Sequence, residues 1–88
     1  MSAYAVEHYL PEPDALQAVV SRLASAAEAI SADGLPVRLA CSILVREDEL
    51  CIHLFAAASQ EAVAKTAERA GLPIERIAEA ALVWPAAR

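Results

Sequence analysis

The sequence predicts a small α+β domain in which a strand, a helix, two strands, a second helix and a last strand follow one another. Three observations lead to this prediction. Apolar residues alternate in four segments, as in strands with one covered face. In two other segments they recur every three or four positions, as on one side of a helix. Glycine or proline stands at several of the boundaries between these segments. The length of 88 residues is that of one domain, so we expect residues 1–88 to form a single domain.

The first strand and the first helix come from the N-terminal third of the chain. Residues 3–10 are expected to form a strand, with Tyr4 and Val6 on the side opposite Glu7. Two prolines, at positions 11 and 13, end this strand and open a helix, because proline is tolerated in the first helical turn. The apolar side of the helix consists of Leu16, Val19, Val20, Leu23, Ala27 and Ile30. Asp33-Gly34 ends it, since glycine accepts the positive φ that follows a last turn.

A hairpin occupies the middle of the chain. Residues 35–45 and 50–57 are the expected second and third strands, and an acidic turn centred on Glu47-Asp48 joins them. One side of the second strand is uniformly apolar and consists of Val37, Leu39, Cys41, Ile43 and Val45.

The second helix and the last strand complete the domain. Ser59 is a suitable N-cap for the helix, and Gly71-Leu72-Pro73 ends it. Residues 77–84 are expected to form the last strand, which Pro85 ends. In that strand we expect Leu82 and Trp84 to point into the core.

Two right-handed crossovers and one hairpin connect these elements. They predict a four-stranded antiparallel sheet of spatial order 4-1-3-2 with both helices on one face. This is the ferredoxin-like βαββαβ fold, built as a split βαβ arrangement.

The register of the hairpin decides which sheet face Cys51 and His53 occupy, because a slip of one residue exchanges the faces. A loop of two or four residues pairs Leu44 with Cys51 and Ser42 with His53. We favour this register, since it collects the apolar side of the second strand with Leu50, Ile52 and Leu54 under the helices. It places Cys51 and His53 on the uncovered face. A loop of three or five residues would instead bury them beside Cys41.

One polar constellation is expected on that uncovered face. Glu7, His53 and Glu79 come from three neighbouring strands, with Cys51 beside them. Imidazole and carboxylate ligands suit divalent ions, and a thiolate shifts the preference toward nickel, copper or zinc. The alternative is a histidine that hydrogen-bonds Tyr9 or Glu7 and binds no ligand. His8 points to the face opposite Glu7 and is expected at the solvent edge.

Composition excludes several classes of partner. A net charge of −5 with a single lysine argues against nucleic acid and against an anionic membrane surface. No apolar run reaches the roughly 20 residues of a membrane span, and no secretory signal is visible. We therefore expect a cytoplasmic protein. Its two cysteines, Cys41 and Cys51, form no CxxC pair and read as buried free thiols.

Much of the apolar share is alanine, so the core is small and a second chain is expected to cover spare apolar surface. Small domains of this shape dimerise through their sheets and enclose a cavity. A small-molecule-binding or monooxygenase-like dimeric α/β-barrel protein is therefore the alternative function. A pure interaction module is a third. No catalytic constellation is evident, because no second catalytic group or activated nucleophile accompanies His53.

Five segments carry a resemblance to a known family. They are Glu7-His8-Tyr9-Leu10-Pro11, Val45-Arg46-Glu47-Asp48-Glu49 after Ser42, Cys51-Ile52-His53-Leu54-Phe55, Ala58-Ser59-Gln60-Glu61-Ala62-Val63 and Arg69-Ala70-Gly71-Leu72-Pro73-Ile74-Glu75-Arg76-Ile77-Ala78-Glu79. The chain resembles a small actinobacterial domain-of-unknown-function family that includes a nickel-responsive nickel-binding protein. The resemblance implies a ferredoxin-like homodimer and nickel binding. The chain departs from the family at His8, where arginine is expected, and at His53, where cysteine is common.

Together these observations predict a homodimer, joined through the uncovered sheet face, that binds a divalent metal, most simply nickel. The expected metal ligands are His53, Glu7, Cys51 and Glu79.

Overall fold

The structure is a computed structural model that describes residues 1–86. Its elements, in chain order, are β1 (Ser2–Tyr9), η1 (Pro13–Ala15), α1 (Leu16–Ala32), β2 (Val37–Val45), η2 (Arg46–Asp48), β3 (Leu50–Ala57), α2 (Gln60–Arg69) and β4 (Arg76–Ala80). The two η elements are single 3-10 turns.

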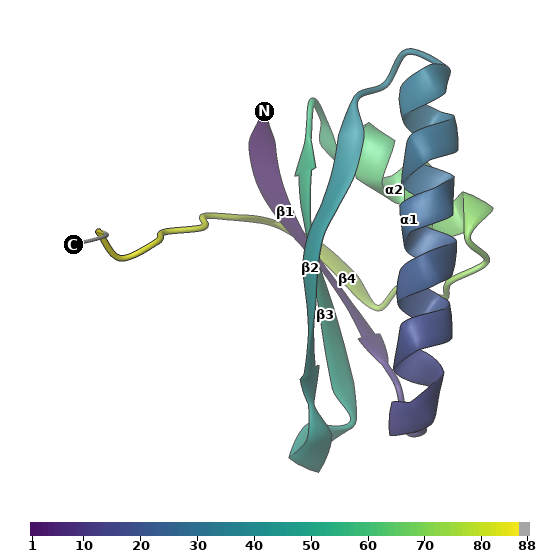
Figure 1. The fold of residues 1–88 in the computed structure, drawn as a ribbon, viewed down its shortest axis with the longest axis vertical. Coiled ribbons are helices and arrows are strands. Elements are labelled where there is room, and N and C mark those ends of the chain that lie inside the picture. Colours follow the sequence, from purple (N-terminus) through teal and green to yellow (C-terminus); the bar gives the residue numbers. More distant parts are fainter. Residues whose placement is uncertain (87–88) are drawn as a thin grey trace.

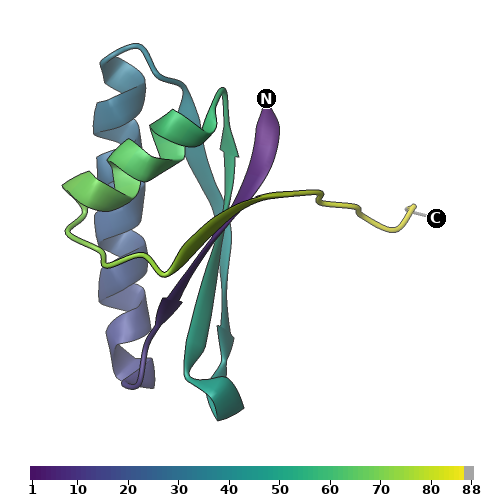
Figure 2. The same cartoon turned by 180° about the vertical axis from the view of Figure 1, so that it is seen from behind.

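The four strands form one antiparallel sheet of order β2-β3-β1-β4. Read from the other edge, the neighbours are those of the order 4-1-3-2. Both α-helices lie on the same side of the sheet, and the opposite side carries no helix (Figures 1 and 2). The result is a two-layer α+β fold that is consistent with the ferredoxin-like arrangement.

The helix boundaries follow the local signals in the sequence. Gly34 follows α1 with a φ of 100°, and Gly71 follows α2 with a φ of 71°, a backbone region that glycine adopts without a Cβ penalty. The hydroxyl of Ser59 accepts a hydrogen bond from the Ala62 amide at 3.2 Å, which confirms the expected N-cap of α2.

The predicted hairpin register is confirmed. Leu44 pairs with Cys51 and Ser42 pairs with His53. Val45 and Leu50 are the last pair before the turn, so four residues connect the strands. Within this loop, the Glu49 amide donates to the Arg46 carbonyl at 3.2 Å.

The predicted faces of the hairpin are wrong, and the cause is a β-bulge. Ala40 has no partner, because the pairing steps from Leu39 to Cys41 while β3 advances by one residue. The apolar side of β2 therefore changes face at Ala40. Cys41 and the residues that alternate with it beyond the bulge lie on the uncovered side of the sheet. With the register as predicted, Cys51 and His53 must then lie under the helices, where both are fully buried.

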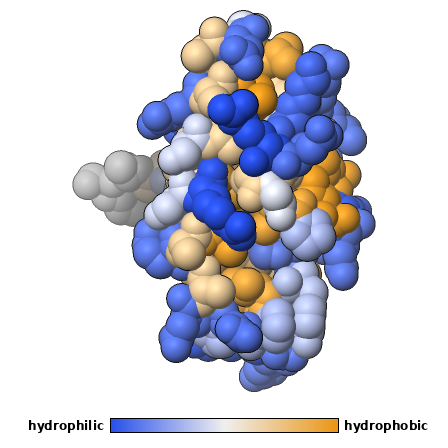
Figure 3. Space-filling view, turned by 90° about the vertical axis from the view of Figure 1, so that its right-hand side faces the viewer, coloured by the Kyte–Doolittle hydropathy of each residue, from blue (hydrophilic) through white to orange (hydrophobic). Residues whose placement is uncertain are grey.

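The uncovered side of the sheet is called the open face below. Its residues are Ala3, Ala5, Glu7, Tyr9, Arg38, Cys41, Ile43, Val45, Leu50, Ile52, Leu54, Ala56, Arg76, Ala78 and Ala80. Most of them are apolar, and Ile43 is 45% exposed. Figure 3 views the molecule from the opposite side, over the helices, where hydrophilic side chains surround smaller hydrophobic areas.

The last strand is shorter than predicted. It ends at Ala80, which pairs with Ala3 of β1. β4 is an edge strand whose only neighbour in the sheet is β1, and its pairing with β1 does not continue past Ala80. The expected inward position of Trp84 is also wrong, since its side chain is 76% exposed.

The core lies between the sheet and the helices. Its largest fully buried apolar side chains are Phe55, Leu23, Val6 and Val63. Ala26 and Ala27 of α1 and Ala62 and Ala67 of α2 are also buried. Among residues 1–86, neither α-helix has the length and apolarity that a membrane crossing needs.

Candidate metal centre

Three side chains with metal-binding atoms meet under the helices at the hairpin end of the sheet. His8 of β1 is paired with Cys51 of β3, and His53 lies two residues further along β3 on the same side. The exposed fractions of their side chains are 2%, 0% and 0%. These residues are called the histidine–cysteine cluster below.

The three ligand atoms converge on one point. The Nε2 atoms of His8 and His53 are 2.8 Å apart, and the Sγ atom of Cys51 lies 3.4 Å from Nε2 of His53. All of the ligand atoms lie within 4.8 Å of one another. The two imidazole rings are stacked, with centroids 4.9 Å apart and planes 15° from parallel. One ion could therefore reach all three residues.

The far side of each imidazole is held by a further partner. Nδ1 of His8 is 3.2 Å from the Tyr9 carbonyl oxygen, and Nδ1 of His53 is 2.6 Å from the hydroxyl of Ser42. A metal-bound histidine commonly uses its second nitrogen in this way, to fix the ring and its tautomer. The expected proximity of Ser42 and His53 is confirmed by this contact.

These contacts assign the protons when no ion is present. The Tyr9 carbonyl only accepts, so His8 carries its proton on Nδ1 and offers the Nε2 lone pair. His53 then donates from Nε2 to His8 and accepts from Ser42 at Nδ1. A metal ligand at Nε2 of His53 would need the proton on Nδ1 instead. The Ser42 hydroxyl suits both states, because it can donate or accept.

Burial keeps the cluster neutral. Desolvation lowers the pKa of His53 to about 4, with a smaller contribution from the neighbouring His8. Desolvation also lowers the pKa of His8, although the Tyr9 carbonyl opposes the shift. Burial raises the pKa of the Cys51 thiol. Both imidazoles thus present lone pairs at neutral pH, whereas the thiol must lose its proton to bind an ion.

Two of the predicted ligands are not part of this cluster. Glu7 lies on the open face, where its carboxylate is 3.6 Å from the guanidinium of Arg76. Glu79 is exposed on β4 and shares the side of Tyr4, its partner in β1, rather than that of Glu7. The predicted approach of Glu7, His53 and Glu79 is therefore wrong. His53 pairs with Val6 and so lies on the face opposite Glu7. Glu79 shares the face of His53, but the residue of β4 that lies level with His53 is Ile77.

His8 is the residue that the sequence prediction missed. Its expected orientation, opposite to Glu7, agrees with the structure, but the expected solvent-edge position is wrong. The sequence did contain a signal for the burial of His8. His8 alternates with Tyr4 and Val6, so it lies on the side of β1 that carries the larger apolar side chains. A strand side that buries Val6 also buries His8, provided that the helix layer extends that far.

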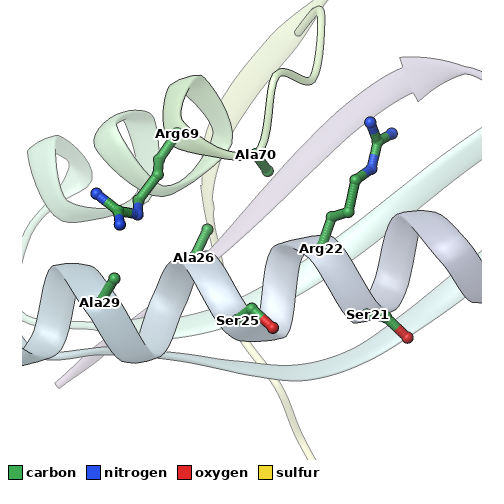
Figure 4. Close-up of a pocket in the computed structure, with 7 residues that line it drawn as sticks. All are labelled: Ser21, Arg22, Ser25, Ala26, Ala29, Arg69 and Ala70. Carbon is green, nitrogen blue, oxygen red and sulfur yellow. The ribbon is translucent and has the colours of Figure 1, made fainter.

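A hollow lies on the outer surface between α1 and α2. It has a volume of about 400 Å³, and its lining includes Arg22 and Arg69 together with serines and alanines. Figure 4 shows that the two guanidinium groups point in different directions rather than toward a common point. The hollow therefore offers no convergent binding group comparable to the histidine–cysteine cluster.

Comparison with known proteins shows the fold alone. No protein-family model matches the sequence, and no curated protein matches it. The solved structure of SCO4226 from Streptomyces coelicolor A3(2) is similar, with a TM-score of 0.76 and 19% sequence identity. The similarity covers 94% of this chain and 100% of that one. Its source organism is an actinobacterium.

Proposed function

We propose that this protein binds a divalent metal ion at His8, Cys51 and His53. The observation that carries the proposal is the convergence of two imidazole nitrogens and one sulfur in a buried site, with both Nδ1 atoms held by separate partners. Two imidazoles and one thiolate suit nickel, copper and zinc better than calcium or magnesium. Nickel is the ion that the sequence resemblance favours. A free Cys51 thiol is consistent with a reducing compartment such as the cytoplasm.

Calorimetric titration of chelator-stripped protein tests the proposal. We expect nickel to bind with one ion per chain, and zinc and copper are titrated in parallel. Because the Cys51 thiol is protonated before binding, the measured enthalpy should depend on the ionisation enthalpy of the buffer, as a released proton requires.

Variants locate the site. His53→Gln and Cys51→Ala should each weaken binding by more than about 100-fold, beyond the 10–100-fold that loss of a second-shell partner causes. Cys41→Ser is the matched control, because Cys41 is exposed on the open face and lies outside the cluster. Glu7→Gln and Glu79→Gln should also leave affinity unchanged. Unchanged binding by His53→Gln would show that the cluster does not bind the ion. Loss of binding in Cys41→Ser would show that the ion binds on the open face instead.

We also propose that the protein forms a homodimer through the open face. The support is the apolar character of that face, on which Leu50, Ile52 and Leu54 of a central strand have no helix above them. In such a dimer the space between the sheets would contain Glu7 but not His53. In the alternative of a monooxygenase-like cavity protein, His53 would therefore not line the cavity, and no observation favours this alternative.

A further inference from the structure

Residues 81–86 form an extended segment that is called the C-terminal arm below. It leaves the end of β4 and projects away from the domain on the side of the sheet opposite the helices (Figures 1 and 2). Val83 is 86% exposed and Trp84 is 76% exposed. Trp84 is the only tryptophan of the chain. A large aromatic side chain in water is unusual, because burying it would remove 150–250 Å² of surface from solvent.

The composition of the arm is typical of a strand, but the arm is not paired with any strand of its own sheet. Leu82, Val83 and Trp84 include residues that are enriched in strands. The ladder of β4 with β1 ends at the pair of Ala80 with Ala3. The arm also points toward the side on which a second sheet would pack. We infer that the C-terminal arm clasps a second copy of this chain, with Trp84 of each copy buried against the open face of the other.

The reach of the arm fits this arrangement. Facing sheets pack about 10 Å apart. Trp84 is the fourth residue after Ala80, and four extended residues span about 13 Å. The side chain of Trp84 therefore reaches the level of a facing sheet, beyond the face of its own.

The area of the open face indicates why an arm is needed. The strands have five to nine residues each, and at about 3.3 Å per residue and about 4.8 Å between strands they give a flat area of about 500 Å². A stable interface buries about 800 Å² on each partner. Trp84 and Val83 supply much of the difference, since one tryptophan alone contributes about 200 Å². The inference rests on the proposed homodimer and adds the element that would hold it together.

Two side chains already present in the protein report on the two parts of this interface. The fluorescence of Trp84 reports on the arm alone, as the chain has no other tryptophan. The alkylation rate of Cys41 reports on the open face, and Cys51 is an internal reference because it is buried inside the domain.

Dilution of the wild-type protein, followed by sedimentation, is the experiment. At concentrations where the protein is a dimer, we expect Trp84 emission to be blue-shifted and protected from acrylamide quenching, and alkylation of Cys41 to be slowed. Both signals should change together as the dimer dissociates. Trp84→Ala should raise the dimer dissociation constant at least tenfold, whereas Trp84→Phe should restore most of the affinity.

The two proposals fail in different ways. A dimer that protects Cys41 but leaves Trp84 solvated and quenchable would overturn the clasp and keep the open-face dimer. A chain that stays monomeric up to millimolar concentration, with Cys41 freely alkylated, would overturn both. Ile52→Lys on the open face separates them further. It should dissociate the dimer, and Trp84 should then become as exposed as it is in the isolated chain.

Discussion

At the hairpin end of the sheet, the helix-covered face carries more polar side chains than the open face, which is the reverse of the usual distribution. The helix-covered face buries two histidines and a cysteine there, whereas the open face presents Leu50, Ile52 and Leu54 of the same strand. Burying polar groups is costly unless they have partners. In residues 1–86, no buried side-chain nitrogen or oxygen lacks one. The more apolar face of β3 is the one left uncovered, so the neighbours of β3, and not its own hydropathy, decide which of its faces is covered.

The largest difference between the faces should be seen in Phe55 and Leu54, adjacent residues on opposite sides of β3. Phe55→Ala should lower the free energy of unfolding by about 3–5 kcal/mol, because Phe55 is fully buried in the core. Leu54→Ala should cost only about 1 kcal/mol in the monomer, since Leu54 is half-buried. Urea unfolding at low protein concentration measures both.

The same pair tests the partner of the open face. If a second copy covers Leu54, the cost of Leu54→Ala should grow with protein concentration, while that of Phe55→Ala stays constant. Equal costs for the two substitutions at low concentration would contradict the assignment of the faces.

Acid should destabilise the metal-free protein through the covered face. In the folded state the pKa of His53 is about 4, against 6.5 in the unfolded chain. Between these values the unfolded chain binds more protons, so stability is complete above pH 6.5 and falls as the pH drops toward 4. The shift corresponds to roughly 3 kcal/mol, and the lowered pKa of His8 acts in the same direction.

Denaturant unfolding between pH 7 and pH 4 checks this expectation. His53→Gln is the control, because it removes the titrating ring and leaves the rest of the chain unchanged. The prediction fails if the variant and the wild type lose stability equally over this range.

A smaller effect is expected at the edge of the cluster. Ser42→Ala removes the hydroxyl that is 2.6 Å from Nδ1 of His53 and leaves that nitrogen without its partner. We expect a loss of about 1 kcal/mol, the low end of the range for a buried unsatisfied group, because Ser42 is only half-buried. Thermal unfolding measures the loss. Ser42→Thr keeps a hydroxyl and should recover most of it, and equal destabilisation by both variants would show that the hydrogen bond is not the cause.

The local signals in this sequence were sufficient for the elements and for the hairpin. Ser59 caps α2, Gly34 and Gly71 follow the helices, and the acidic turn sets the register of β2 and β3. The helix ends depend on residues close together in the chain, so that sequence spacing alone predicts them. The hairpin register was chosen between two sets of loop lengths from the alternating apolar pattern.

The composition of the site came from the sequence only in part. Cys51 and His53 were expected together because they are two residues apart on one strand. His8 could not be added from local spacing, since its position beside Cys51 depends on the pairing of β1 with β3, two strands separated by a helix and a hairpin. Glu7 and Glu79 were added because the face of His53 was assigned incorrectly.

The sequence by itself therefore determined the order of the elements, the ends of the helices and the pairing of the hairpin, because short-range backbone chemistry controls all three. Only the tertiary structure decided which face of β3 is buried. A single unpaired residue, Ala40, changes the face on which the following residues of β2 lie. His53 and Cys51 pair with residues on the side of β1 that carries its larger side chains, and they lie under the helices with that side. The tertiary structure also decided where β4 ends, because that depends on its pairing with β1, a strand distant in the sequence, and the pairing stops at Ala80 and Ala3.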